Sequence, residues 1–418
     1  MSAEDRIADY LLQAGFGGGI GGRFTIGSSL LSGTDILPSA WTEFFNGPDD
    51  DLTNDVADGS TIQISRGWDS VLASVESGKC SATVLKPSAI AHYDPNDPAS
   101  PMYSLTPGFV PMRPFRLIAS NDVWATSHGL FYGFIRTADY NPDTGECVIQ
   151  AEDLMLWLSR IENPVISPVS GISSSQAVGL LLDSFGFTDP GFRSLSATPS
   201  VTSMNFSGDG TVTALDLLKG IIDAEQGYAF VDGNGVFHFE DRYARDRRRV
   251  ASYAFSAELT NINSRASADA IANRVTVTSS VTGHAQIAED PTSIQNFGVG
   301  DATNITSDYL PDDVSAAALA YLIMRRLKDP HPPQTGTIYN ETAALLATQL
   351  GLELQQRLTI DGVDVFLERL EHVIGAGGVQ LATTVLVSQV PATLAFEIGV
   401  STLADPAVIP AVADYLGA

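Results

Sequence analysis

The sequence predicts a mainly β protein in which two β regions, each a barrel or a sandwich, bracket a small α/β unit. Short segments of alternating apolar and polar residues, separated by Gly, Pro, Asn and Asp, occur in the N-terminal and C-terminal thirds. Two helical patterns and a hairpin lie between them. The length of 418 residues suits two to four domains, and 44% hydrophobic with only 17% charged residues predicts a compact chain.

Residues 1–40 are expected to form an N-terminal arm. Gly, Ser and small apolar residues dominate from Ala14 to Ser32, and each Gly lowers the stability of a helix or strand through backbone entropy. We therefore expect a loop, hairpin or arm that becomes ordered only against a partner. A chain that lacks residues 1–32 should still fold.

Residues 41–160 are expected to form the first β domain. Gly, Pro, Asn and Asp separate its short strand-like segments, and a turn-rich link of Asp, Asn and Pro runs from Asp94 to Pro101. The predicted strands are Ile62–Ser65, Cys80–Leu85, Pro114–Ala119, Gly129–Ile135 and Cys147–Ala151.

Residues 161–250 are expected to form the small α/β unit. Ser173–Phe185 has apolar residues on one helical face, and Thr213–Ala224 begins with a cap residue followed by Asp216 at the third helical position. Tyr228–Val231 and Val236–Phe239 flank an Asp-Gly-Asn-Gly turn, which is typical of a hairpin.

Residues 251–390 are expected to form the second β domain, with a helical interruption. Asn273–Thr278 alternates as a strand, and Asp313 is the expected cap of a helix through Leu327 that ends before His331-Pro332-Pro333. The other predicted strands are Thr337–Tyr339, Gln356–Val365 and Leu381–Val387. Residues 391–418, rich in Ala, are expected to form a C-terminal docking tail.

The formal net charge of −26 argues against nucleic-acid binding. Affinity for a phosphate backbone is built from Lys and Arg contacts, and this chain has 23 basic against 49 acidic residues. The charge would keep the protein soluble, and it is also compatible with a repulsive wall along a passage for DNA.

The chain is expected to be made in a cytoplasm and to stay out of membranes. Its first ten residues carry charges instead of a basic run followed by an apolar one, and no apolar stretch reaches the length of a membrane span. Cys80 and Cys147 lie far apart and are expected to be reduced, buried thiols.

The sequence predicts no enzyme, no metal site and no cofactor. None of the six His residues has a recognisable catalytic setting, and there is no Gly-x-Ser-x-Gly, His-Glu-x-x-His, phosphate-loop or dinucleotide motif. The acidic run Asp49–Asp51 lacks the remaining ligands of a calcium loop and is expected to be a solvated turn.

A basic cluster stands out in this acidic chain. Arg245, Arg247, Arg248 and Arg249 follow the predicted hairpin. Arginine forms bidentate contacts with carboxylates, so the cluster is a candidate interface for a neighbouring subunit or partner. The alternative is a solvated loop.

An ordered set of short motifs resembles the minor tail proteins of long-tailed bacteriophages. The N-terminal set consists of Arg66-Gly67-Trp68, Ser77–Leu85, Tyr93-Asp94-Pro95 and Ser100-Pro101-Met102-Tyr103. The resemblance continues through Phe115-Arg116-Leu117, Leu130–Gly133, Ala151-Glu152-Asp153-Leu154, Gly235–Arg242, Asn273-Arg274-Val275-Thr276-Val277, Asp290–Ile294, Leu367–Ile374 and Ala382–Ser388. It covers about residues 50–390. The segment before residue 40 has no counterpart, and Val379-Gln380-Leu381 replaces the aromatic residue usual in this family.

The resemblance implies a baseplate hub at the tail tip of a virion. It implies two similar tube domains that alternate around a threefold ring, with the α/β unit outside. The implied partners are two further copies of the chain, the distal tail protein, the tape measure protein and peripheral tip or fibre proteins. Genomic DNA would pass without specific binding, and the host surface would be contacted only indirectly.

Three alternatives remain open at this stage. A distal tail protein would form a sixfold ring from one tube domain with an appended domain. A tail-associated cell-wall hydrolase would need a catalytic set, which the sequence does not offer. A carbohydrate-binding adhesin would use exposed aromatic residues such as Trp41, Trp68 or Trp124, although single Trp residues pack more often in cores or interfaces.

Overall fold

The computed structural model describes most of the chain between residues 51 and 389, together with a short N-terminal strand. The described residues are 9–14, 51–68, 75–85, 93–94, 97–98, 100, 113–121, 124–162, 164–196, 204–209, 212–264, 271–300, 303–329, 333–375 and 380–389. No helix among them is long and apolar enough to cross a membrane.

The chain is mainly β, and strands from both ends of the sequence form one 12-stranded sheet. Its order is β1-β4-β5-β6-β3-β2-β19-β20-β17-β13, with β18 and β12 branching from β19. The N-terminal strands are β1 (Asp9–Ala14), β2 (Ile62–Gly67), β3 (Lys79–Leu85), β4 (Pro114–Asn121), β5 (Trp124–Tyr140) and β6 (Glu146–Glu152). The C-terminal strands are β12 (Tyr253–Phe255), β13 (Thr260–Ser264), β17 (Gln334–Tyr339), β18 (Arg357–Ile360), β19 (Val363–Ile374) and β20 (Leu381–Gln389).

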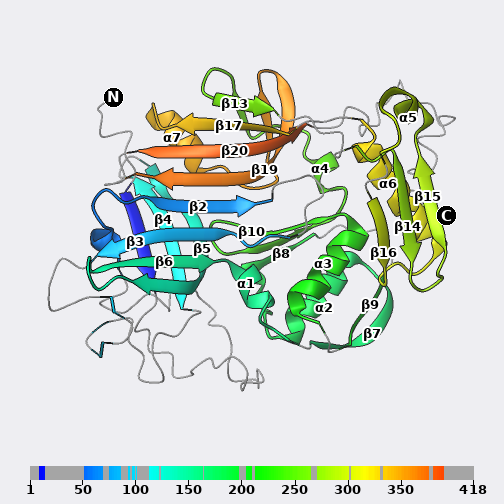
Figure 1. Ribbon diagram of the computed structural model, residues 1–418, viewed down its shortest axis with the longest axis horizontal. Coiled ribbons are helices and arrows are strands. Elements are labelled where there is room, and N and C mark those ends of the chain that lie inside the picture. The colour runs from blue at the N-terminus through cyan, green and yellow to red at the C-terminus, as the bar shows by residue number, and fades with distance from the viewer. Residues whose placement is uncertain are drawn as a thin grey trace.

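The two β regions meet where β2 pairs antiparallel with β19, from Ile62 opposite Ile374 to Gly67 opposite Arg369. Figure 1 shows β17, β20, β19, β2, β3 and β6 side by side. The mainly β prediction is confirmed. The expectation of two barrel-like tube domains stays a prediction, because the strand order describes one continuous sheet.

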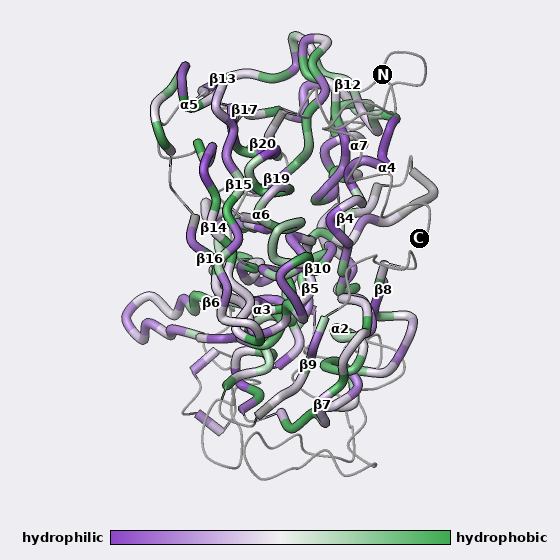
Figure 2. Tube along the Cα trace, turned by 90° about the vertical axis from the view of Figure 1, so that its right-hand side faces the viewer, coloured by the Kyte–Doolittle hydropathy of each residue, from purple (hydrophilic) through white to green (hydrophobic). Residues whose placement is uncertain are grey.

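Alternation along the strands separates a core face from an outer face. In β2 and β3 every second side chain is buried, including Ile64 and Cys80, and the side chains between them are less buried. Along the trace as a whole, hydrophilic and hydrophobic residues alternate over short stretches (Figure 2). One core lies against β1–β6 and α7 (Ala343–Leu350), and a second lies against β18–β20 and the hairpin of the α/β unit.

Part of the expected N-terminal arm belongs to the protein's own core. Residues Asp9–Ala14 form β1, which pairs with β4 and has Leu12 and Ala14 fully buried. The apolar residues of this short segment alternate, and this outweighs the Gly-rich stretch that follows it. Deleting residues 1–32 would therefore remove an edge strand. The Gly-rich stretch itself lies outside the described residues.

The small α/β unit follows β6. It contains α1 (Leu154–Leu158), β7 (Val165–Ile172), α2 (Ser174–Ser184), η4 (Pro190–Phe192), β8 (Arg193–Leu195), β9 (Met204–Asp209), α3 (Ala214–Glu225), β10 (Tyr228–Val231), β11 (Phe237–Glu240) and α4 (Ala244–Arg247). The predicted helices and hairpin are present. Ser173 and Thr213 form capping boxes with Gln176 and Asp216, which explains where α2 and α3 begin.

A further unit of three strands and two helices lies within the C-terminal region. Its sheet has the order β15-β14-β16, and α6 covers one face. The elements are β14 (Arg274–Ser279), β15 (Ala285–Glu289), α5 (Pro291–Phe297), β16 (Thr303–Ser307) and α6 (Asp313–Leu327). It lies beside the α/β unit (Figure 1), where the Phe206 and Tyr309 rings stack at 5.9 Å.

This unit is an insertion into a hairpin of the large sheet. β13 and β17 pair antiparallel, with Ser264 opposite Gln334, so the chain leaves and re-enters the sheet at one place. The two ends of the unit lie next to each other, because the Ala272 N–H at its start donates to the Leu327 carbonyl at its end at 2.9 Å.

Several local expectations needed correction. Asp312, not Asp313, accepts the capping hydrogen bond of α6 from the Ser315 N–H. The motif Asp290–Ile294, which in the tail-protein resemblance corresponds to a loop, is the start of helix α5, because Asp290 is an N-cap and Pro291 fits the first helical turn. Helix α7 was not predicted. The 3-10 turn η3 (Thr53–Asp55) precedes β2.

Candidate functional site

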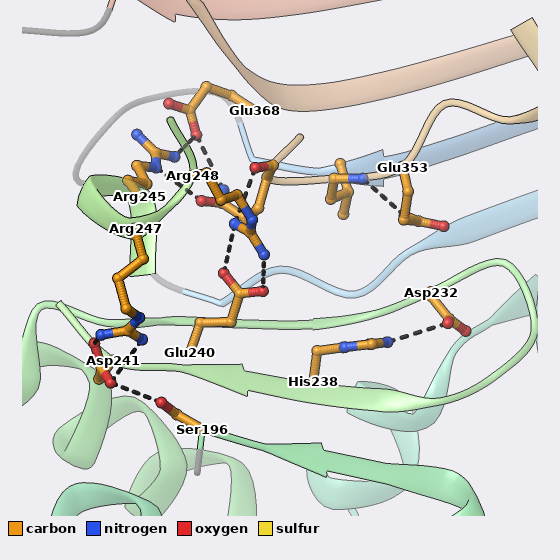
Figure 3. Close-up of polar contacts among 12 residues, drawn as sticks. Ser196, Asp232, His238, Glu240, Asp241, Arg245, Arg247, Arg248, Glu353 and Glu368 are labelled. Atoms are coloured by element: carbon orange, nitrogen blue, oxygen red, sulfur yellow. Dashed lines mark hydrogen bonds and ion pairs between the residues drawn. The ribbon is translucent and has the colours of Figure 1, made fainter. Parts of the chain in front are cut away.

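The arginine cluster lies in and after α4, between the α/β unit and the large sheet (Figure 3). The chain reaches this place because β11 ends at Glu240 and a tight turn at Asp241 starts the short helix. The sequence prediction treated these residues as one surface patch. The structure distributes them between the interior and the surface.

Arg245 is buried in the junction. Its Nη2 contacts Glu368 Oε2 at 2.5 Å, and its Nε donates to Gln355 Oε1 at 2.8 Å. The guanidinium carbon lies 4.1 Å from the centre of the Tyr228 ring, which adds a cation–π contact. Burial opposes the charge of Arg245, but the carboxylate of Glu368 and the nearby Tyr228 outweigh it and raise the pKa of Arg245.

Glu368 collects donors from all three parts of the chain. Besides Arg245 from α4, Trp68 after β2 donates its indole N–H at 3.1 Å, and Ser388 of β20 donates its hydroxyl. Because Glu368 is only 1% exposed, these donors replace the water that the carboxylate would otherwise bind. The cluster therefore joins the α/β unit to both halves of the large sheet.

The other three arginines lie closer to solvent than Arg245. Arg247 makes a bidentate contact with Asp241 at 3.1 and 3.0 Å, and Arg248 makes one with Glu240. Burial opposes the ionised form of Asp241, but its hydrogen bonds with Arg247 and Ser196 dominate and lower the pKa of that carboxyl. Arg249 is exposed and, among the described residues, has no ion pair.

A second ion pair, with a buried arginine and a partly exposed carboxylate, lies at Arg66, a family-like motif residue. Its Nη1 contacts Glu353 Oε1 at 2.6 Å and the Val231 carbonyl at 3.5 Å. The other oxygen of Glu353 accepts from the Gly233 N–H at 3.1 Å. Arg66 thus fastens the β10–β11 hairpin between β2 and the segment that precedes β18.

The next motif residue, Gly67, has a backbone that only glycine suits. Its φ is +99°, and a Cβ atom there would lie 2.1 Å from the Glu368 carbonyl oxygen. The close approach lets the Trp68 N–H donate to that carbonyl at 3.1 Å. The Arg-Gly-Trp motif is therefore explained by the junction itself.

We expect Gly67→Ala to lower the free energy of unfolding by about 2–3 kcal/mol, from backbone strain and overlap with β19. Thermal and denaturant unfolding would measure it. Gly59→Ala is the control, because Gly59 also has positive φ (+77°) but no atom within 4 Å of its Cβ position. Equal losses in the two variants would show that the close contact with β19 is unimportant.

Asp153 fixes the exit from the first β region. Its carboxylate accepts from the Met155 N–H at 2.9 Å, as the cap of α1, and from the Gly78 N–H at 2.7 Å and the Ser77 hydroxyl at 3.1 Å. Burial dominates and raises the pKa of Asp153 to about 7 despite these hydrogen bonds. This motif residue has a structural role.

The remaining motif residues lie apart from this junction. Asn273 is fully buried and bridges Ser293, the Gly298 carbonyl and the Gly300 N–H, and Arg274 pairs with Glu289 on the inserted sheet. The Asp94 carbonyl accepts from the Asp97 N–H at 3.2 Å, and the Ser100 N–H donates to the Asp97 carbonyl at 2.9 Å. Pro95 and Pro101 lie outside the described residues.

Sequence reasoning missed the carboxylate and amide side chains that the arginines contact in the junction. Glu353, Gln355 and Glu368 were not singled out, although Glu368 interrupts an apolar run in a strand. A charged residue in such a run signals a buried partner of opposite charge. The ion pairs and hydrogen bonds of the junction attach the α/β unit to the large sheet. The described residues contain no group of His, Cys, Asp and Glu that could hold a metal ion.

The fold is that of a group of tail proteins. The chain matches a tail protein from Neisseria meningitidis MC58 with a TM-score of 0.52 and 12% identity, covering 79% of this chain and 92% of that one. It matches the 43 kDa tail protein of prophage MuSo2 from Shewanella oneidensis with a TM-score of 0.50, 11% identity and the same two coverages. No protein-family model and no curated protein matches the sequence.

Proposed function

We propose that this chain is a structural hub protein of a phage tail tip, without enzymatic activity. The observation that carries the proposal is the fold shared with tail proteins over 79% of the chain. Three copies would form a ring that continues the tail tube, each contributing two tube domains. The distal tail protein, tape measure protein and peripheral tip or fibre proteins would attach to this ring, and genomic DNA would pass through it during ejection.

The large sheet ends in an edge strand at each side, β1 and β13, and each edge can pair with a strand of a neighbouring subunit. This supports assembly into a ring. β13 pairs only with β17 among the described residues, and all of its side chains are exposed. A strand with unpaired backbone groups is a template for another strand. Head-to-tail contacts between unlike edges close into a ring when the rotation fits.

The arginine cluster contributes to assembly mainly by holding the chain's own units together. Arg245, Arg247 and Arg248 use their guanidinium groups on carboxylates of the same chain. Arg249, which is exposed beside Val250, is the member that we assign to a partner contact. Acidic surface on the neighbour would suit it.

The direct test is the symmetry of the assembly. We expect particles reconstructed by electron microscopy to show this chain as a threefold ring at the tail tip. A sixfold ring would identify a distal tail protein instead. Absence of the chain from purified particles would contradict the tail assignment as a whole.

A single substitution tests the edge contact. Ile262 of β13 is 49% exposed, and we expect Ile262→Lys to weaken ring formation at least about tenfold, because a charge on an edge strand opposes strand addition. Stability should change by no more than about 0.5 kcal/mol. Analytical ultracentrifugation over a concentration series measures the association.

The matched control is Ile287→Lys, which places the same charge on the edge strand β15 of the inserted sheet, at a residue 62% exposed. It should leave ring formation unchanged. If both variants assemble like the unmodified chain, β13 is not a subunit contact.

A further inference from the structure

A cavity of about 480 Å³ lies between the α/β unit and the inserted unit. Residues of β7 and β9 form one part of its wall, the segment that starts α3 forms another, and Asp308 and Tyr309, which follow β16, complete it. Figure 1 shows α3 next to β16 at this boundary. The volume is within the range of about 300–1,000 Å³ that is usual for ligand pockets. Ser170, Ser207 and Asp308 are exposed, so the cavity opens to solvent.

Two aromatic rings form a fixed part of the cavity wall. The rings of Phe206 and Tyr309 stack with their centroids 5.9 Å apart and an angle of 29° between their planes. The Asn205 N–H holds the Tyr309 carbonyl at 2.9 Å. Gly220 of α3 lets the Tyr309 ring approach the helix, because a Cβ atom there would lie 2.3 Å from Tyr309 Cε2. Glycine weakens the interior of a helix, and the packing of this ring explains its presence in α3.

The cavity carries one unpaired charge. Among the described residues of its wall, Asp308 alone is charged, and its carboxylate has no ion pair or hydrogen bond within the described part of the chain. The rest of the wall consists of apolar side chains, the two rings, Asn205 and two serines. An apolar occupant would bury the carboxylate without a partner, and an anion would be repelled by it. The occupant that fits must therefore bring a positive charge.

We infer that this cavity is a docking site for an arginine side chain of a partner protein. The guanidinium can bond to Asp308 in a bidentate manner and lie against the Tyr309 ring, while its stem packs on the apolar side chains of the wall. The oxygens of Asn205 and the two serines can accept its remaining N–H groups. The ammonium of lysine is more strongly hydrated and stacks less well on rings. The net charge of −26 also favours a basic partner surface.

The surroundings of the cavity favour a protein segment over a free small cation. Val165 of β7 is 79% exposed, and Val212 of the cavity wall is 37% exposed. Among the described residues β7 pairs only with β9, so its other edge is open. A partner segment that inserts an arginine would also cover these apolar side chains, whereas a small molecule would leave them in water. The inference goes beyond the proposed function, because it names the chemistry of one attachment site.

The test measures binding of a short arginine peptide, acetyl-Ala-Arg-Ala-amide, to the full chain by saturation-transfer NMR. We expect the same peptide with citrulline in place of arginine to bind at least about tenfold more weakly, because citrulline keeps the shape and loses the charge. Asp308→Asn should weaken binding of the arginine peptide by a similar factor of at least about ten. Free L-arginine should also bind more weakly, because it brings a carboxylate of its own and no flanking peptide.

The matched control is Asp58→Asn, which removes the same charge from an exposed position before β2 and should bind the arginine peptide like the unmodified chain. The inference is overturned if the unmodified chain does not bind the arginine peptide, if the citrulline peptide binds equally well, or if Asp308→Asn binds unchanged. Equal binding of free L-arginine would overturn the assignment to a partner protein. None of these results bears on the symmetry of the ring, so the hub proposal is tested separately.

Discussion

Replacing Arg245 with alanine is expected to lower the free energy of unfolding by about 3–5 kcal/mol, because it leaves the carboxylate of Glu368 buried without its cation. Trp68, Gln355 and Ser388 would still donate to Glu368, but none carries a positive charge. The lost stacking on Tyr228 adds to the effect. Denaturant unfolding followed by circular dichroism measures the change.

Two controls separate the buried charge from general effects. Arg249→Ala, at an exposed position, should change stability by no more than about 0.5 kcal/mol. Combining Arg245→Met with Glu368→Gln removes both charges and should recover part of the loss, which a double-mutant cycle quantifies. If the double variant is as unstable as the sum of the single ones, the pair is not coupled as the geometry requires.

Acid is expected to destabilise the protein through His372, with a loss of up to about 1.4 kcal/mol per pH unit as pH falls from about 6.5 toward 3. Burial, with a smaller effect from Arg66, lowers the pKa of His372 to about 3. The folded chain holds this histidine neutral in that range while the unfolded chain gains a proton. The contribution of neutral His372 to the stability is therefore fully present above the pKa that this histidine has in the unfolded chain, and it is lost as pH falls below that value.

The surroundings of His372 do little to stabilise the protonated, positively charged form of its ring. Nδ1 contacts Thr383 Oγ1 at 3.0 Å, and Thr383 also accepts from Gln349, while Nε2 has no hydrogen-bond partner among the described residues. Asp153, whose pKa is raised by burial, has the opposite effect on stability between about pH 4 and 7. We therefore compare the chain with its His372→Gln variant, because Asp153 contributes equally to both. The difference in stability between the two chains should shrink as pH falls from 6.5. A pH-independent difference would show that His372 is not held neutral.

The elements that could be predicted from sequence are those whose signal is local. Helices α2 and α3 begin at their capping boxes because Ser173 and Thr213 bond backbone N–H groups three residues later. The β10–β11 hairpin follows from its Asp-Gly-Asn-Gly turn. Strands β2, β3 and β14 follow from simple alternation.

The elements that could not be predicted depend on distant partners. The β2–β19 pairing joins residues about 300 positions apart in sequence, and nothing in either strand specifies the other. β1 is a strand because β4 pairs with it, and the adjoining Gly-rich stretch concealed this. The arginine cluster drew attention through composition, and two of its partners, Glu240 and Asp241, lie close to it in sequence. Its buried partner Glu368 is 123 positions away from Arg245, and only tertiary folding brings the two together.

The adjacent ends of the inserted unit have a consequence for the evolution and redesign of this chain. Because Ser264 lies opposite Gln334 and Ala272 is bonded to Leu327, the segment between β13 and β17 is a module with adjacent entry and exit points. It also packs against the α/β unit. Arg326 donates to the Gln226 and Arg242 carbonyls, the Asn205 N–H donates to the Tyr309 carbonyl, and Ala224 of α3 belongs to the core of the inserted unit. We therefore expect a module of another size to fit here without altering the register of the hairpin, provided that it covers the same surface of the α/β unit.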